Sequence, residues 1–403
     1  ESGATIVIDP GLLWSTFYGG SNADRANGIA LDGGGNVLVT GSTASVNFPV
    51  VYGTPISNSG QQDAFIMKVA TDGASVIWAI YYGGSFQEFG TGIAIDGVGN
   101  IVCTGHTTSA NFPVSPGAYQ GTINTGSDAY VLKLNPNGVR LWATFYGGNN
   151  IDYGHGIAVD GSNNVYITGQ TSSNNLTGTF GAFQQNTGGL VDAYIAKFTS
   201  AGNMSFATYI GGSLSDVGND LVVDGTGNIY VTGYTHSSNF PVSGGTQNTL
   251  YGINDAFVIK FNSSGQRVWG TYYGGSSSDI GTAIALGGNG AIFFAGETTS
   301  TNLATPTNVF RPFLVGGSEG FIVKLSSGGN IDWATYIGGT GNDGITDVAT
   351  AYGNTVAVSG YTHSTNYPTT VNGAQTTLAG PSDGFVAKFS IKNPAQGTYA
   401  QNK

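Results

Sequence analysis

The stretch WSTFYGG at residues 14–20 decides the fold, because its pattern returns five more times along the chain. In every copy an aromatic residue stands five positions before a Gly-Gly pair, at intervals of 64, 64, 64, 63 and 64 residues. These aromatic anchors are Trp14, Trp78, Trp142, Phe206, Trp269 and Trp333. Counted from the first glycine of the pair, each copy also has an acid at plus 5, a glycine at plus 22 and an asparagine at plus 28. Such a period predicts a propeller or a solenoid.

Each copy contains four short strand signals, which in the first copy lie at residues 28–31, 36–40, 64–69 and 77–82. The first two are joined by the turn Asp32–Asn36, whose glycines and asparagine accept positive φ angles. Four strands joined in this way form one antiparallel sheet, and sheets repeated radially form a propeller. The sequence therefore predicts an all-β, six-bladed β-propeller.

The two ends of the chain predict how this ring closes. The last copy stops after its third strand at residues 384–389, whereas the stretch at residues 12–18 resembles a fourth strand with no sheet of its own. We expect the strand at about residues 12–18 to complete the last blade, so that no sheet edge is left exposed. Residues 1–390 then form a single domain, and residues 391–403 form a tail or linker.

The composition narrows the class of protein. The 403 residues include 67 glycines, only 9% are charged, and the net charge of −11 comes without a basic stripe. Nucleic acid and anionic membrane are therefore unsuitable partners. The chain contains neither an apolar run near 18 residues nor a signal-peptide pattern, so we interpret it as a mature or excised piece. Its one cysteine, Cys103, falls in an expected strand and is predicted to be a buried thiol.

The repeated cassette resembles a known family. The segments WSTFYGG at 14–20, GIALD at 28–32, VTGST at 39–43 and NFP at 47–49 are similar to the bacterial β-propeller repeat called SBBP, and the match recurs over residues 11–390. The family name implies seven blades, whereas this chain has six cassettes. The resemblance implies an extracellular or cell-surface bacterial protein, often part of a larger adhesin-like chain. It transfers no catalytic residues.

The acids at plus 5 allow two interpretations. They are Asp24, Glu88, Asp152, Asp216, Asp279 and Asp343, and a second set opens the third strand of each blade at Asp63, Asp128, Asp192, Asp255, Glu319 and Asp383. A ring of six plus-5 carboxylates near the channel mouth would hold a hard cation such as Ca²⁺. Alternatively, each carboxylate accepts backbone N–H groups within its own loop, and we favour this interpretation because ligands of one ion converge.

Residues that break the repeat are the candidates for ligand binding. The position after the plus-22 glycine varies most, and it is occupied by Ser42, His106, Gln170, Tyr234, Glu297 and Tyr361. Blades 4 and 6 depart together, with an aspartate at plus 9, a tyrosine at plus 23 and a histidine at plus 25; these are Asp220, Tyr234 and His236, and Asp347, Tyr361 and His363. Counting along the hairpin, we expect His236 to approach Asp216 and His363 to approach Asp343. A histidine–carboxylate pair suits ligand binding or proton transfer, whereas a shared duplication is the simpler explanation.

The sequence favours a non-catalytic binding, adhesion or protein-interaction module that needs no cofactor. Its expected partner is a glycan or another surface protein, within a larger chain or assembly. One alternative is a polysaccharide lyase or hydrolase that uses the histidines, tyrosines and acids above, because propellers host many chemistries. The other alternative is a structural spacer. The chain has neither a metal-binding histidine motif nor a P-loop.

Overall fold

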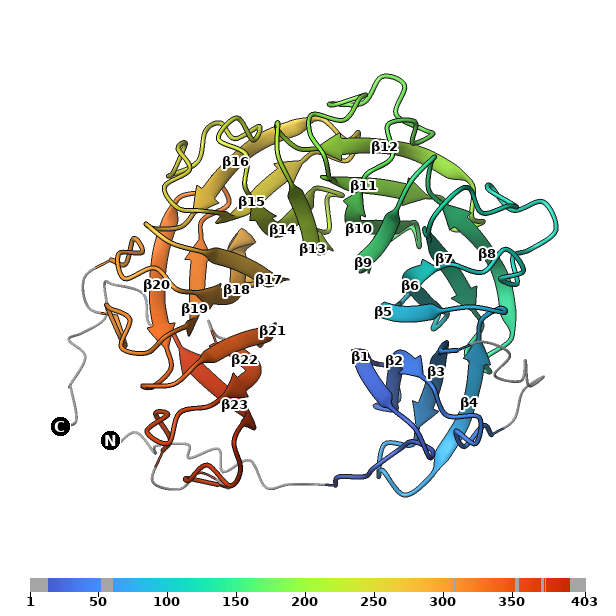
Figure 1. Cartoon of the computed structure of the whole chain (residues 1–403), viewed down its shortest axis with the longest axis horizontal. Coiled ribbons are helices and arrows are strands. Elements are labelled where there is room, and N and C mark those ends of the chain that lie inside the picture. Colours follow the sequence, from blue (N-terminus) through green and yellow to red (C-terminus); the bar gives the residue numbers. More distant parts are fainter. Residues whose placement is uncertain are drawn as a thin grey trace.

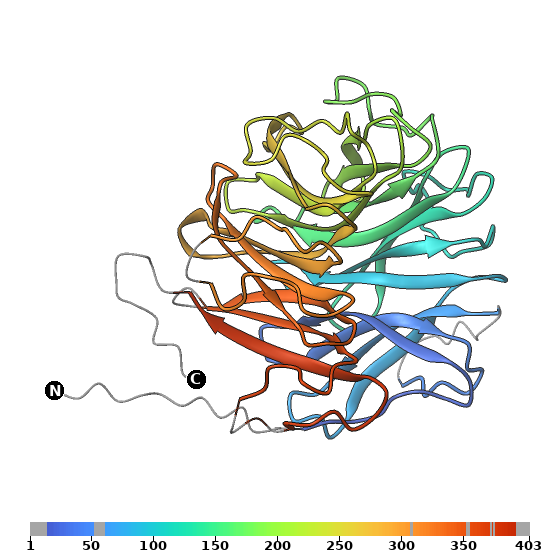
Figure 2. The same cartoon turned by 60° about the vertical axis from the view of Figure 1, so that its left-hand side comes forward.

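The computed structural model describes residues 14–51, 61–306, 309–351, 355–370, 373 and 375–391. Within these ranges the chain forms a six-bladed β-propeller, with six antiparallel sheets arranged around a central channel (Figure 1). Figure 2 shows the same sheets from the side, each twisted across its strands. No helix in these ranges has the length and apolarity needed to cross a membrane.

Each blade begins at the channel and adds its strands outward. The strands of blades 1 to 3 are β1 (Asp24–Leu31), β2 (Val37–Thr43), β3 (Asp63–Val69), β4 (Val76–Tyr82), β5 (Glu88–Ile95), β6 (Ile101–Thr107), β7 (Asp128–Leu134), β8 (Arg140–Tyr146), β9 (Asp152–Val159), β10 (Val165–Thr171), β11 (Asp192–Phe198) and β12 (Met204–Ile210). The strands of blades 4 to 6 are β13 (Asp216–Val223), β14 (Ile229–Thr235), β15 (Asp255–Phe261), β16 (Arg267–Tyr273), β17 (Asp279–Leu286), β18 (Ile292–Thr298), β19 (Glu319–Leu325), β20 (Ile331–Ile337), β21 (Asp343–Ala351), β22 (Thr355–Thr362) and β23 (Asp383–Ser390). A short 3₁₀ turn, η1 (Gly288–Gly290), lies between β17 and β18.

The core lies between neighbouring blades, where the repeated aromatic residues pack. Trp78 and Trp269 are buried, and each donates its indole N–H to the carbonyl oxygen of a turn in the next blade, at 3.1 Å to Pro136 and 3.0 Å to Ser327. Gly138, which follows Pro136 in that turn, has a positive φ of 79° and lies against the ring of Trp78. A side chain there would be strained and would displace the indole. Cys103 is buried in this core, as the sequence predicted.

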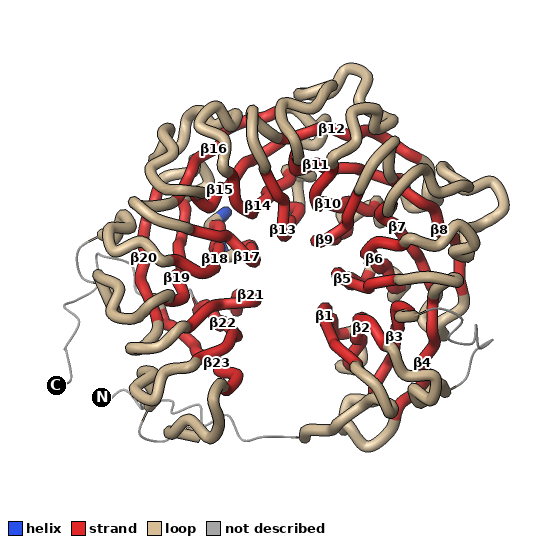
Figure 3. The backbone as a smooth tube through the Cα atoms, in the orientation of Figure 1, coloured by secondary structure: helices blue, strands red, loops and turns tan. Residues whose placement is uncertain are grey.

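Within the described residues, the ring is not closed between blades 6 and 1. The last sheet has three strands, and Figure 3 shows it standing apart from blade 1. In the expected closing strand, residues 14–18 are not in strand conformation, whereas residues 12 and 13 lie outside the described residues. Val386 on β23 is consequently 82% exposed, although its counterpart Ile66 in blade 1 is fully buried.

The start of the described chain nevertheless contacts blade 1 as a fourth strand would. Trp14 donates its indole N–H to the carbonyl oxygen of Thr71 at 3.0 Å, and Tyr18 donates its hydroxyl to that of Pro49. The corresponding tyrosine on β4 of blade 1, Tyr82, donates in the same way to the carbonyl oxygen of Pro113 in blade 2. The contact of this segment with blade 1 is therefore present, whereas its expected pairing with β23 is absent from the described residues.

Candidate functional site

The plus-5 acids are held separately, each within its own loop. Asp152 is buried and accepts hydrogen bonds from the Gly148 N–H at 2.7 Å, the Ser173 hydroxyl at 2.8 Å and the Thr171 hydroxyl. The same three donors recur around Asp216, Asp279 and Asp343. Glu88 and Asp24 likewise bond the second glycine of the pair and a nearby hydroxyl. These contacts match the interpretation as loop acceptors, and no cluster of three or more His, Cys, Asp or Glu side chains suited to a metal occurs among the described residues.

The variable position after the plus-22 glycine has different surroundings in each blade. In blade 2 the His106 ring lies between the rings of Phe89 and Tyr153, with centroids 4.7 Å and 4.1 Å away. Burial lowers the pKa of His106 to about 4, with a smaller contribution from His155, so this imidazole is neutral near pH 7. In blades 5 and 6 the structure brings two candidates together, because the Tyr361 hydroxyl donates to Glu297 Oε2 at 2.7 Å.

In blades 4 and 6 the structure brings tyrosine and histidine together. The ring centroids of Tyr234 and His236 are 5.7 Å apart, and those of Tyr361 and His363 are 5.8 Å apart. The expected contact of His236 with Asp216 is displaced by one residue, because a β-bulge between Gly218 and Asp220 shifts the register.

As a consequence of that shift, Asp216 pairs with Thr235 across the strands. His236 Nδ1 lies 3.2 Å from the carbonyl oxygen of Ser215. In blade 6, His363 Nδ1 lies 2.9 Å from that of Asn342. Both histidines are therefore bound to loop backbone.

Asp220 and Asp347 belong to the channel wall. The Asp220 carboxylate accepts the backbone N–H of Leu221 at 2.8 Å and that of Ile284, in the next blade, at 3.0 Å. Burial raises the pKa of Asp220 to about 7, and the negative charge of Asp347 adds to the rise. Asp347 accepts the N–H of Val348 at 2.7 Å. These contacts connect the two aspartates to strand backbone and make Asp220 a link between blades 4 and 5.

Sequence reasoning did not identify a series of hydrogen bonds along the channel. His155 Nδ1 lies 3.0 Å from the carbonyl oxygen of Gly218 in the next blade. The same position in other blades makes the same contact, through the side chains of Asn27, Thr91, Asn219 and Thr282 at 2.8 Å. His155 is therefore one of five equivalent ties between blades.

We call the junction of two neighbouring blades a seam, so that blades 2 and 3 meet at seam 2/3. A cavity of about 330 Å³ lies at seam 2/3. It is lined by Tyr119, Gln120, Asn124, Gly147, Asn175 and Thr177. The first three come from the β6–β7 loop of blade 2, and the last two come from the β10–β11 loop of blade 3. The Tyr119 hydroxyl donates to the Thr177 hydroxyl at 2.8 Å and so connects the two walls.

This cavity combines three side-chain amides, two hydroxyl groups and one aromatic ring, which is 37% exposed at Tyr119. Amides both donate and accept hydrogen bonds, and an aromatic face packs against apolar ligand surface. Such a lining suits a neutral ligand rich in hydroxyl groups. In the sequence, this site corresponds to Tyr119 and Asn124, which lie in a loop of nearly the same length in every blade.

Comparisons with known proteins agree with this fold. Residues 13–49, 77–113, 141–177 and 206–241 match the SBBP family, which is described as a β-propeller repeat. The regulatory protein FlaEY of Caulobacter vibrioides is 24% identical over 93% of this chain, and an uncharacterized WD repeat-containing protein of Acanthamoeba polyphaga mimivirus is 22% identical over 88%. The chain spans 40% and 31% of the lengths of these relatives.

Solved structures resemble the chain at the level of the fold. A Dyadobacter fermentans protein of unknown function matches with a TM-score of 0.44 and 11% identity, over 87% of this chain and 94% of that one. A catalytically inactive virginiamycin B lyase of Staphylococcus aureus matches with a TM-score of 0.43 and 13% identity, over 83% of this chain and 77% of that one.

Proposed function

Starting from a chain that carries the repeats of the SBBP β-propeller family, we propose that it is a non-catalytic module that binds a glycan. The module is secreted or displayed on a bacterial surface, within a larger protein or assembly. The observation that carries the proposal is the cavity at seam 2/3, with its amides, hydroxyl groups and tyrosine ring.

The chemistry of the cavity lining supports a neutral saccharide as the ligand. Asn124 and Asn175 offer side-chain amides without a net charge, so a hydroxyl-rich ligand can replace its water contacts there. The Gln120 amide is bonded to Asp128 and to the Gly147 N–H and completes the wall of the cavity. Tyr119 supplies the ring on which the apolar face of a sugar packs. In blades 4 and 6, the side chains of His236 and His363 already contact backbone carbonyl groups. This supports ligand binding, and not catalysis, as the role of the loops that carry them.

A screen of the purified chain against a broad glycan and polysaccharide panel tests this proposal, with binding and ligand mass measured together. We expect retention of a neutral glycan whose mass does not change. Fragmented glycans would instead support a polysaccharide lyase or hydrolase, and His236→Ala and His363→Ala variants would then show whether the histidines act in it. If the chain retains only a surface protein, the binding site lies outside the cavity. If it binds nothing, the alternative of a structural spacer is favoured.

A further inference from the structure

At three of the seams between neighbouring blades, two acids, one from each blade, lie against the first glycine of the Gly-Gly pair, at Gly83, Gly147 and Gly338. At seam 2/3 these are Asp128, at the start of β7, and Asp152, at the start of β9. Asp128 Oδ1 and Asp152 Oδ2 lie 2.6 Å and 2.7 Å from the point where a β-carbon on Gly147 would stand. Glycine is therefore required there, because a methyl group would displace both carboxyl groups.

This pair is fully buried, and its hydrogen-bonding partners are neutral. Both side chains are 0% exposed. Asp128 Oδ2 accepts the Gln120 amide at 2.6 Å and the Asn124 N–H at 3.2 Å, whereas Asp128 Oδ1 has no hydrogen-bond partner. Among the residues that the structure describes, no Lys, Arg or His forms an ion pair with either acid. Two buried carboxyl groups this close are not ionised together without a counter-charge.

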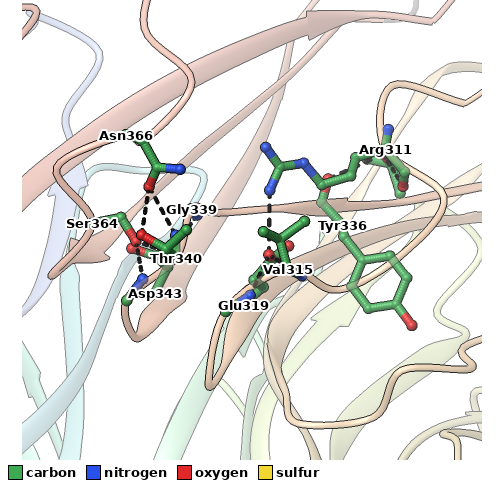
Figure 4. Close-up of polar contacts among 12 residues, drawn as sticks. Arg311, Val315, Glu319, Tyr336, Gly339, Thr340, Asp343, Ser364 and Asn366 are labelled. Carbon is green, nitrogen blue, oxygen red and sulfur yellow. Dashed lines mark hydrogen bonds and ion pairs between the residues drawn. The ribbon is translucent and has the colours of Figure 1, made fainter.

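The junction of blades 5 and 6, seam 5/6, contains the missing counter-charge. There Arg311 stands in the position of Gln120, and Glu319 stands in the position of Asp128. Arg311 Nη1 lies 3.2 Å from Glu319 Oε1 (Figure 4). The side chains of Glu319 and Asp343 both lie against Gly338. The same arrangement of two acids is therefore accompanied by a permanent cation in one seam and by neutral amides in another.

We propose that the carboxyl pair of seam 2/3, Asp128 with Asp152, retains one proton near neutral pH, so that this pair stabilises the propeller most in acid and less as the pH rises. In the two following seams the corresponding acids are Asp192 with Asp216 and Asp255 with Asp279; burial raises the pKa of the first acid of each, and the charge of the second acid adds to the rise. The close packing of Gly147 against both acids favours a proton over a metal ion, because Ca²⁺ requires space for about six to eight oxygen ligands.

The direction of the pH effect follows from the pKa values of the pair. Burial raises the pKa of Asp128 to about 7, with a further contribution from the charge of Asp152, and burial raises the pKa of Asp152 to about 6. Because the values in the folded state exceed those of an unfolded chain, the pair contributes its full stability below about pH 4. That contribution is lost as the pH rises through the folded values of about 6 and 7.

The other titratable groups near these pairs do not reverse the effect. The phenols of Tyr146, Tyr194 and Tyr209 face the acids of seam 2/3, and burial raises the pKa of all three, so they stay neutral in this range. His236 faces Asp216 in the seam between blades 3 and 4. In the seam between blades 4 and 5, the facing groups are the phenols of Tyr272, Tyr273 and Tyr336, whose pKa values burial also raises. Seam 2/3 is therefore the best place for a test.

Thermal melting of the whole chain and of Asp128→Asn, from about pH 5 to about pH 8, provides the test. The asparagine keeps the shape of a protonated acid and carries no charge at any pH in this range. We expect the variant to melt higher than the unmodified chain near pH 8, by on the order of 5 °C, and this difference to become smaller toward pH 5. The proposal is overturned if the melting temperatures of the two proteins change with pH in parallel, or if the variant is less stable than the unmodified chain near pH 8.

Asp383→Asn is the matched control. Asp383 opens β23 and accepts the Gln375 amide and the Ala379 N–H, each at 2.7 Å, as Asp128 accepts Gln120 and Asn124, but it is only half-buried. Asp383→Asn should leave the pH dependence of the melting temperature unchanged. If it changes that dependence as Asp128→Asn does, the pairing of Asp128 with Asp152 is contradicted. Should Asp128→Asn fail to fold, Asp192→Asn makes the same comparison. Stabilisation by millimolar CaCl₂ near pH 8 in the whole chain but not in Asp128→Asn would replace the proton with a metal ion.

Discussion

Seam 2/3 and seam 5/6 place different side chains on the same backbone. In seam 2/3 the loop residues are Tyr119, Gln120, Asn124 and Thr177, and the matching residues of seam 5/6 are Phe310, Arg311, Val315 and Pro368. The first set is neutral and polar around a cavity, whereas the second is apolar around a guanidinium. The matching loops of these two seams have the same length but different side chains. We therefore expect one substitution in such a loop to alter both the proposed ligand binding and the charge of the buried acids.

The largest effect is expected when seam 5/6 loses its cation. Arg311→Gln leaves Glu319 buried beside Asp343 with only an amide as neighbour, as Asp128 is in seam 2/3. Near pH 8 we expect a loss of about 2–3 kcal/mol of unfolding free energy, at the lower end for a buried pair because the Arg311 side chain is 21% exposed. The loss should become smaller at lower pH, because burial raises the pKa of Glu319 and favours its protonated form. Chemical denaturation at about pH 8 and about pH 5 measures it.

Arg140→Gln is the control for this substitution. Arg140 donates to the carbonyl oxygen of Pro113 at 2.7 Å and to no acid, so its loss should cost about 1 kcal/mol or less and show no pH dependence. An equal cost for both arginines, unaffected by pH, would contradict the contrast between the two seams.

The reverse exchange should flatten the pH dependence of seam 2/3. The double variant Gln120→Arg with Asp128→Glu installs the residues of seam 5/6 and supplies a permanent positive charge. We expect the stability of this variant to fall less between about pH 5 and about pH 8 than that of the unmodified chain, by about 1 kcal/mol or more. Melting curves over that range measure the difference. If the stability of this variant falls with pH as steeply as that of the unmodified chain, the acids of seam 2/3 are not the groups whose titration causes the fall.

Asn124→Val should weaken ligand binding with little effect on stability. The change removes an amide from the cavity of seam 2/3 and copies Val315 of seam 5/6. Loss of one hydrogen bond to a ligand predicts an affinity that is about tenfold weaker, measured by titration with a glycan retained in the panel. Val315→Asn is the control and should leave the affinity unchanged. If both variants bind as the unmodified chain does, the cavity is not the site.

The fold could be predicted because the residues that determine it are repeated. The anchor Trp78 and the turn around Gly138 contact each other across blades, and both recur at fixed spacing. The closure at residues 12–18 was predicted from the strand count, yet the described part of that segment contacts only blade 1. A strand count shows that a sheet lacks a member but does not determine which neighbour a free segment pairs with.

The candidate site was harder to predict, for two physical reasons. The contact expected between His236 and Asp216 depended on register, and a single bulge at Gly218 shifted it by one residue. Tyr119 and Asn124 lie in a loop of nearly the same length in every blade, so loop length does not mark them as the lining of a cavity. The pairing of Asp128 with Asp152 arises from the packing of one blade against the next, which sequence spacing within a blade does not reveal.

The most direct test of ligand binding at seam 2/3 compares Tyr119→Ala with Phe310→Ala on the same glycan panel. Both rings make an edge contact with a phenylalanine of the next blade, at 6.1 Å to Phe198 and 5.7 Å to Phe389, so the two changes disturb packing alike. The proposed function predicts that Tyr119→Ala loses the glycans that the unmodified chain retains, while Phe310→Ala keeps them. Equal retention by both variants, each with an intact melting transition, would contradict it.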